Sequence, residues 1–302
     1  MESQSHLSSA PARPKQWYDR YYKLLLVIPL IILAFCLVYL FSFYQQHGDI
    51  MLKDVSLSGG TTITLQGNVD RVAVEQAVKQ DVPDVSVRAI TELRTGKPVA
   101  VIVESSSAPD KIQPALERVL GYKLTNDNAT IEFTGPILSK NFYSQLMSAL
   151  IFSFILIAIV IFIMFRSFVP SIAVIFAIFA DVVMPLALVN ALGIKLSAAG
   201  IAAFLMLIGY SVDTDILLTT RVLKKREGSV NERIYGAFKT GIFMNITGLL
   251  AVLPAFFIVT GLPDSFRQIF FVLALGLVAD IMNTWLTNAS ILKWYTVRRR
   301  MN

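Results

Sequence analysis

Long uncharged apolar runs constrain the fold of this chain more than any other feature of its sequence. The first covers residues 24–43, a length that crosses a bilayer as an α-helix. Five more runs follow in the second half of the chain, at residues 142–165, 168–192, 196–218, 241–261 and 269–292. Strands of a membrane barrel would alternate apolar and polar residues, so these continuous runs predict six transmembrane helices.

The first run could also belong to a cleaved signal peptide, because positive residues precede it. It is too long for a typical signal-peptide core, and residues 39–47 contain no small-x-small cleavage pattern. We therefore interpret residues 24–44 as an uncleaved first transmembrane helix. Residues 1–23 then form a polar segment that is expected to be disordered or to lie on the membrane surface.

The basic residues predict the orientation of the chain. With the N-terminus in the cytoplasm, the short outer loops contain only Lys195 and Arg267. The cytoplasmic segments contain Arg13, Lys15, Arg20, Lys23, Arg166, Arg221, Lys224, Lys225, Arg226, Arg233, Lys239, Lys293, Arg298, Arg299 and Arg300. Both termini, including a basic tail at 293–302, are thus predicted to be cytoplasmic. These charges can meet anionic membrane lipids, so the net charge of +6 requires no nucleic acid.

Residues 45–140 have a mixed, charged composition and are predicted to form a domain outside the cytoplasm, between the first helix and transmembrane helices 2–6 at 141–292. The expected elements are a strand at 55–65, a helix at 69–79, strands at 85–94 and 98–104 joined by a turn at 95–97, a helix at 109–120 and a strand at 130–133. This β-α-β-β-α-β order predicts an α+β, ferredoxin-like domain with two helices on one face of the sheet.

The composition argues against an enzyme. One cysteine and two histidines provide neither a disulfide nor a metal cluster. The outer domain has no plausible pair of nucleophile and base, and the chain has no nucleotide-binding loop. We therefore expect no cofactor, and we interpret the outer domain as a binding or moving domain.

Four acids lie within the predicted spans: Asp181, Asp213, Asp215 and Asp280. A carboxylate at the centre of a bilayer costs about 2.5–3.5 kcal/mol, so these residues should face the bundle interior, a partner or water. Asp213 and Asp215 are two residues apart, about 200° around a helix, and cannot both face one partner. No lysine or arginine lies near mid-depth in these spans, and a carboxyl there could carry a proton.

The same acids could instead have a structural role as hydrogen-bond acceptors between helices. Five polar residues in the spans could donate to them: Asn190, Asn245, Thr247, Asn283 and Thr284. The sequence leaves both roles open, and Asn245 and Asn283 are also common types of helix-packing residue.

Several short motifs occur together in a specific order. Gly59, Gly60 and Thr61 follow the first span, Gly135 and Pro136 introduce the second, residues 209–215 (Gly-Tyr-Ser-Val-Asp-Thr-Asp) lie in the fourth, and residues 279–285 lie in the sixth. In this arrangement the chain closely resembles the SecF family of protein-export membrane proteins. The resemblance covers all but about the first twenty residues.

The resemblance implies an RND-type bundle and a partner, SecD, that supplies six further helices. It also implies association with the SecY translocon and use of the proton gradient to pull exported unfolded polypeptides outward. Asp213 aligns with the corresponding acid of SecD and is the main proton-carrying candidate. Thr214 stands where bacterial SecF has an aspartate, and residues 280–284 also differ from the bacterial pattern, which looks archaeal.

Supporting residues follow from the same resemblance. Lys239 matches an arginine at the start of the fifth helix of bacterial members, and Thr247 matches a nearby threonine. Arg221 ends the fourth helix. Lys239 can equally be a charge that sets orientation.

The sequence thus predicts a non-enzymatic SecF-like subunit of a SecD–SecF complex that assists protein translocation across the cytoplasmic membrane. Two alternatives remain: half of an RND-like, proton-coupled transporter of small molecules or lipids, and a scaffold whose acids only pack helices.

Overall fold

The computed structural model describes residues 17–67, 69–91, 98–225, 227–258 and 264–301. Several predicted features lie outside the described residues: most of the N-terminal segment with Arg13 and Lys15, the turn at 95–97, Arg226 and the break near 262.

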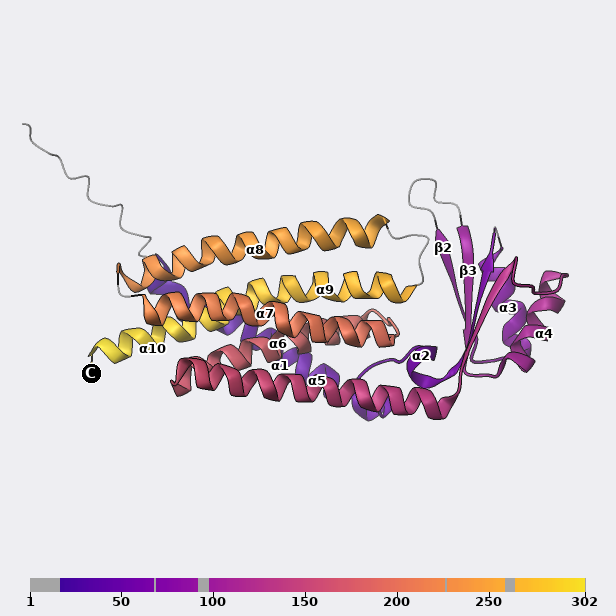
Figure 1. Cartoon of the computed structure of the whole chain (residues 1–302), viewed down its shortest axis with the longest axis horizontal. Helices are drawn as coiled ribbons and strands as arrows, with labels where there is room; N and C mark the ends of the chain where they lie inside the picture. Colours follow the sequence, from indigo (N-terminus) through magenta and orange to yellow (C-terminus); the bar gives the residue numbers. More distant parts are fainter. Residues whose placement is uncertain (1–16, 68, 92–97, 226, 259–263, 302) are drawn as a thin grey trace, which may run out of the picture.

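Six long helical segments lie side by side along the long axis of the molecule (Figure 1). Five are continuous helices: α1 (Trp17–His47), α5 (Pro136–Phe165), α6 (Phe168–Ala191), α7 (Ala198–Lys224) and α8 (Val230–Ile258). The sixth consists of α9 (Asp264–Met282), a π-helical segment η1 (Asn283–Asn288) and α10 (Ala289–Met301). All six segments are long and apolar enough to cross a membrane, which confirms the predicted multi-pass membrane bundle.

The six spans divide into inner and outer helices. In the most apolar parts of α6, α7 and the α9–α10 span, half or more of the residues are buried. In α1, α5 and α8 the buried share is 11% or less. Large apolar side chains such as Phe35, Phe152 and Phe243 cover the outer helices, as a surface in contact with lipid requires.

The sheet domain, residues 53–134, lies at one end of the bundle (Figure 1). Its elements are α2 (Val55–Ser58), β1 (Gly60–Gln66), α3 (Arg71–Asp81), β2 (Ser86–Thr91), β3 (Pro98–Ser105), α4 (Pro109–Leu120) and β4 (Ala129–Thr134). The sheet has the order β2-β3-β1-β4, and all neighbouring strands are antiparallel. Helices α3 and α4 lie on the side of the sheet that is away from the bundle. Ile63, Val101, Val103, Ile112 and Leu116 form part of the core between sheet and helices.

The predicted strand at 55–65 is wrong in its first part. Residues Val55–Ser58 form one helical turn, and the strand begins only at Gly60. The carboxylate of Asp54 accepts a hydrogen bond from the backbone N–H of Ser56, which caps the turn. Gly59 ends it with φ of 84°. The apolar alternation at Val55 and Leu57 suits a strand, but the aspartate before it and the glycine after it favour a helix.

The start of the sheet domain is joined by hydrogen bonds to the loop between α6 and α7. The N–H of Asp54 donates to the carbonyl of Leu196 at 3.0 Å, and the N–H of Leu196 donates to the carbonyl of Leu52 at 2.7 Å. The N–H of Ala198, the first residue of α7, donates to Ser56 Oγ at 3.1 Å. The entry to the sheet domain and the first turn of α7 thus form one hydrogen-bonded junction.

Asp54 at this junction should make stability depend on pH. Its pKa is raised to about 6, mainly by burial; the hydrogen bonds from Ser56 oppose the rise and the charge of Glu104 adds to it. The folded chain therefore binds this proton more tightly than the unfolded chain does. The stabilisation is fully present below about pH 4 and is lost as the pH rises through about 6, amounting to about 3 kcal/mol.

We expect the melting temperature of the purified chain to fall between pH 4 and 7, and Asp54→Asn to flatten this dependence while keeping the cap. Thermal unfolding at a series of pH values, monitored through hydrogen exchange of the β1 amides, would measure how the melting temperature depends on pH. An equal pH slope in the wild type and the variant would contradict the assignment to Asp54.

Candidate functional site

Three acids are buried together in the bundle, one on each inner helix. Asp181 lies on α6, Asp215 on α7 and Asp280 on α9, and each has an exposed fraction of 0%. Because water does not reach them, their polar atoms need partners from neighbouring side chains. Those partners are hydroxyl and amide groups from α7, α8 and η1.

Asp181 is held from two sides. The hydroxyl of Ser211 on α7 donates a short hydrogen bond to Asp181 Oδ2. The amide of Asn283 in η1 donates to Asp181 Oδ1 at 2.7 Å. This acid therefore joins α6 to both α7 and the last span.

Asp280 has the largest set of partners. Asn245 on α8 donates from Nδ2 to Asp280 Oδ2 at 2.7 Å. The hydroxyl oxygen of Thr214 on α7 lies 2.9 Å from Asp280 Oδ1, and that of Thr284 lies 3.1 Å from the same atom. Asp280 is thus the acid where α7, α8 and the last span meet.

Asp215 faces the π-helical segment. Asn288 donates from Nδ2 to Asp215 Oδ1 at 2.7 Å, and the hydroxyl of Thr284 lies 3.0 Å from the same oxygen. Among the residues that the structure describes, no lysine or arginine forms an ion pair with Asp181, Asp215 or Asp280. The acids are held by neutral donors, so no neighbouring positive charge within the described residues fixes them as permanently charged carboxylates.

Asp213 is not part of this buried cluster. Its side chain is exposed on the opposite side of α7, because two residues turn a helix by about 200°. The sequence left open which of the two acids lines the interior; the structure places Asp215 there, and Asp213, the main proton-carrying candidate, faces away from the cluster. Gly209, one turn earlier, lies on the same exposed side as Asp213.

The supporting candidates separate into two groups. Asn245 and Asn283 contact the acids. Lys239 and Thr247 are exposed, and the hydroxyl of Thr247 donates to the carbonyl of Phe243 in its own helix at 2.7 Å. Arg221 donates from Nη1 to the carbonyl of Gly236 at 2.5 Å, which ties α7 to α8 away from the acids.

Three contact residues were missed as members of the site: Ser211, Thr214 and Asn288. A spacing signal could have found the last, because Asp280, Thr284 and Asn288 follow one another at intervals of four, which places them on one helix face. Ser211 and Thr214 lie four and one residues before Asp215, and all three are buried.

Comparisons with known proteins give the family. A family model described as protein export membrane protein SecD/SecF, C-terminal, matches residues 117–298. The protein-export membrane protein SecF of Methanolacinia petrolearia is 38% identical over 274 residues, which cover 90% of this chain and 93% of the relative. SecF of Pyrococcus furiosus is 37% identical, with 92% of each chain covered. The chain belongs to the SecF family.

The solved structures agree on the fold of this SecF chain. A crystal structure of SecDF from Thermus thermophilus, described as a translocon-associated membrane protein, superposes with a TM-score of 0.74 at 18% identity. The match covers 95% of the SecF chain but 39% of that longer chain. At this identity the similarity supports the arrangement of bundle and sheet domain.

The motif residues at the start of the SecF sheet domain have structural roles. A side chain at Gly59 would bring its Cβ to 2.7 Å from Pro136 Cα, and a side chain at Gly60 would bring it to 2.2 Å from the Ser105 carbonyl oxygen. Thr61 donates from Oγ1 to the carbonyl of Ser107 at 2.7 Å. Only glycine permits these close approaches, which bring the start of β1 against the end of β3 and the start of α5.

The second motif marks the start of a SecF helix. Gly135 precedes α5, and Pro136 is the first residue of that helix, where its missing N–H leaves no hydrogen bond unmade.

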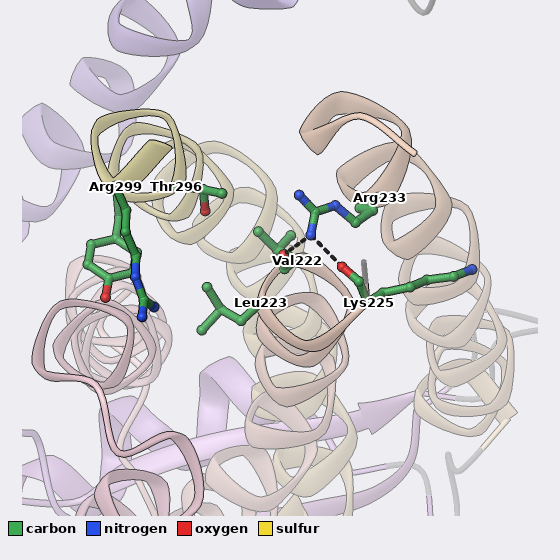
Figure 2. Close-up of a pocket in the computed structure, with 7 residues that line it drawn as sticks. Val222, Leu223, Lys225, Arg233, Thr296 and Arg299 are labelled. Carbon is green, nitrogen blue, oxygen red and sulfur yellow. Dashed lines mark hydrogen bonds between the residues drawn. The ribbon is translucent and has the colours of Figure 1, made fainter. Parts of the chain in front are cut away.

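A pocket of about 320 Å³ lies at the ends of α7, α8 and α10 (Figure 2). The guanidinium of Arg233 donates there to the carbonyls of Val222, at 2.7 Å, and of Lys225, at 2.5 Å. Arg233 thus satisfies carbonyls at the C-terminal end of α7. Residue 222 is seven positions beyond Asp215, about 10 Å along the helix, so this pocket is separate from the acids.

Proposed function

We propose that this chain is the SecF subunit of a SecD–SecF complex, which uses the proton gradient to assist movement of unfolded polypeptides through the SecY translocon. One observation carries the proposal: three buried carboxyls on three different inner helices are held by hydroxyl and amide side chains, and the Thr284 hydroxyl contacts two of them, Asp215 and Asp280. Groups placed in this way can bind and release protons inside the membrane.

The energetics support such a role. Moving one charge through 100 mV releases about 2.3 kcal/mol, which is comparable to the strength of a few of the hydrogen bonds around Asp280. A carboxylate accepts hydrogen bonds only, whereas a carboxylic acid also donates one. Each protonation change therefore alters which contacts between α7, α8 and the last span are favourable, and can shift these helices relative to one another.

The exposed side of α7 is the proposed contact with SecD. Asp213 lies there in the middle of a span, where an acid facing lipid would cost several kcal/mol. A partner helix that supplies polar groups would remove this cost, and Gly209 on the same side would allow it to approach closely.

This contact can be tested with Asp213→Cys. In the chain alone the thiol should react with a small membrane-permeant maleimide, and in the chain purified with a SecD-like partner it should be protected. Equal labelling in the two preparations would contradict a partner at this face.

The remaining assignments complete the proposal. Both termini are placed in the cytoplasm and residues 45–140 outside it, with membrane lipids around the outer helices. We assign the sheet domain to the ferredoxin-like class, supported by its strand order and by two helices on one face. The subunit works without enzymatic activity, cofactor or nucleic acid.

The decisive experiment is export in vesicles that contain this chain, a SecD-like partner and the translocon. An imposed proton gradient should increase the rate at which a secretory polypeptide reaches the protected side, and dissipating the gradient should remove the increase. Omitting this chain provides the matched control.

Export that ignores the gradient would contradict the proposal. Gradient-driven loss of a small molecule or lipid from vesicles that contain this chain alone would instead support the RND-like transporter.

A further inference from the structure

The hydroxyl of Thr284 lies between two of the buried acids. Its Oγ1 is 3.0 Å from Asp215 Oδ1 and 3.1 Å from Asp280 Oδ1. All three residues have an exposed fraction of 0%. The two acids are on different helices, so this single hydroxyl connects α7 to α9.

Counting hydrogens at this contact restricts the protonation of the acids. A threonine hydroxyl has one hydrogen, and an ionised carboxylate has none. If Asp215 and Asp280 were both ionised, only one of the two contacts could be a hydrogen bond. If one acid carries a proton, it donates to Thr284 Oγ1 while Thr284 donates to the other acid, and both contacts are satisfied.

Thr214 gives a separate condition on Asp280 alone. Its Oγ1 lies 2.9 Å from the backbone carbonyl of Ser211 and 2.9 Å from Asp280 Oδ1. The carbonyl can only accept a hydrogen bond, so the hydrogen of Thr214 cannot serve both neighbours. A proton on Asp280 that is donated to Thr214 Oγ1 satisfies both contacts of Thr214, and this corresponds to the state in which Asp280 rather than Asp215 holds the proton.

The π-helical segment holds Thr284 in this position. Thr284 is the second residue of η1, and its carbonyl accepts the N–H of Ala289, five residues on. The amides of Asn283 and Asn288 fix the segment to Asp181 and Asp215 at 2.7 Å each. Segments of this kind are rare and occur frequently at functional sites.

We propose that Thr284 relays protons between Asp215 and Asp280. The proton of the Asp215 carboxyl passes to Thr284 Oγ1 while the hydrogen of Thr284 passes to Asp280 Oδ1. Asp215 is then a carboxylate, Asp280 is a carboxylic acid and Thr284 keeps a hydroxyl. This inference rests on the proposed proton coupling and names the group that links two of its acids.

The test compares Thr284→Val, which keeps the shape without the hydroxyl, with Thr284→Ser, which keeps the hydroxyl. The chain is purified with its bound partner proteins, placed in vesicles and given a proton gradient. Proton entry should fall about 100-fold in Thr284→Val and change by no more than about threefold in Thr284→Ser. Thr296→Val is the matched control, because the hydroxyl of Thr296 donates to the carbonyl of Leu292 in its own helix.

Infrared spectra report separately whether the Thr284 hydroxyl contacts a protonated carboxyl, which the relay requires. The C=O stretch of the protonated carboxyl should shift in Thr284→Val, because the acid loses its hydroxyl partner, and should return in Thr284→Ser. Unchanged proton entry in Thr284→Val overturns the relay. If Thr284→Val does not fold, Thr284→Cys replaces it, since a thiol is a weak donor; proton entry equal to that of Thr284→Ser then overturns the relay.

The proposed function fails in a different way. Unchanged proton entry in both Asp215→Asn and Asp280→Asn would remove proton coupling itself. Loss in those two variants with normal entry in Thr284→Val would remove only the relay.

Discussion

Asp280→Asn should abolish the part of export that depends on the proton gradient. Asparagine has nearly the shape of aspartate and can still form hydrogen bonds with Thr214, Asn245 and Thr284, so the bundle should remain folded. It cannot take up and release a proton. Loss of a positioned proton-transfer group typically lowers the rate of a proton-dependent step by about 100-fold or more. The effect should be measured as export into vesicles with and without an imposed gradient.

Two comparisons make this result specific. Export without a gradient should be equal in Asp280→Asn and the wild type, which reports correct assembly. Asp110→Asn, an identical change on the exposed first turn of α4, should keep the response to the gradient. If Asp181→Asn, Asp215→Asn and Asp280→Asn all kept that response, the buried cluster would be structural.

The second large effect is expected for stability. Gly60→Ala should destabilise the sheet domain by about 4 kcal/mol. The loss has two causes, because residue 60 has a backbone conformation that only glycine adopts readily and because the added Cβ would clash with packed backbone. Gly60 has φ of 132°, and an added Cβ would lie 2.2 Å from the Ser105 carbonyl oxygen. That oxygen belongs to the backbone of β3 and cannot move without disturbing the sheet.

Gly121→Ala is the matched control for this change. Gly121 ends α4 with φ of 75°, and no atom lies within 4 Å of an added Cβ. Only backbone strain of about 1–2 kcal/mol is expected there. Thermal unfolding of the full chain, with hydrogen exchange in β1 and β3, would compare the two. Equal losses would show that the close approach to Ser105 contributes nothing.

The bundle could be predicted from sequence because lipid imposes a simple rule: a span must be long, apolar and helical. The ends of the helices were less predictable. Helix α8 begins at Val230, although its uncharged run begins only at Gly241, because Glu232 and Arg233 continue the helix beyond the apolar part. Hydrophobicity reports where lipid begins, while helix ends depend on capping and on contacts such as those of Arg233 with α7.

The sequence predicted which types of residue form the site, but not which side of α7 faces the bundle interior. Buried carboxylates on several spans followed from the sequence, whereas the choice between Asp213 and Asp215 for the interior position did not. The helical period fixes only that the two acids point apart. Which of them faces inward depends on how α7 packs against α6 and α9. The π-helical segment was also invisible, because η1 carries no residue pattern that separates it from an α-helix, and its position decides which donors reach Asp215.

The hydrogen-bonded junction at Leu196 has a mechanical consequence. Helix α7 runs without interruption from Ala198 to Lys224 and carries Asp215 about 26 Å from Ala198 at the junction. The start of α7 and the loop before it form hydrogen bonds with residues 52–56, so no flexible linker separates α7 from the sheet domain. If protonation of the buried acids tilts α7 by a small angle, the hydrogen bonds around Leu196 would therefore transmit that movement directly to the sheet domain. Because the helix is long, a small tilt would displace the sheet domain by a larger distance.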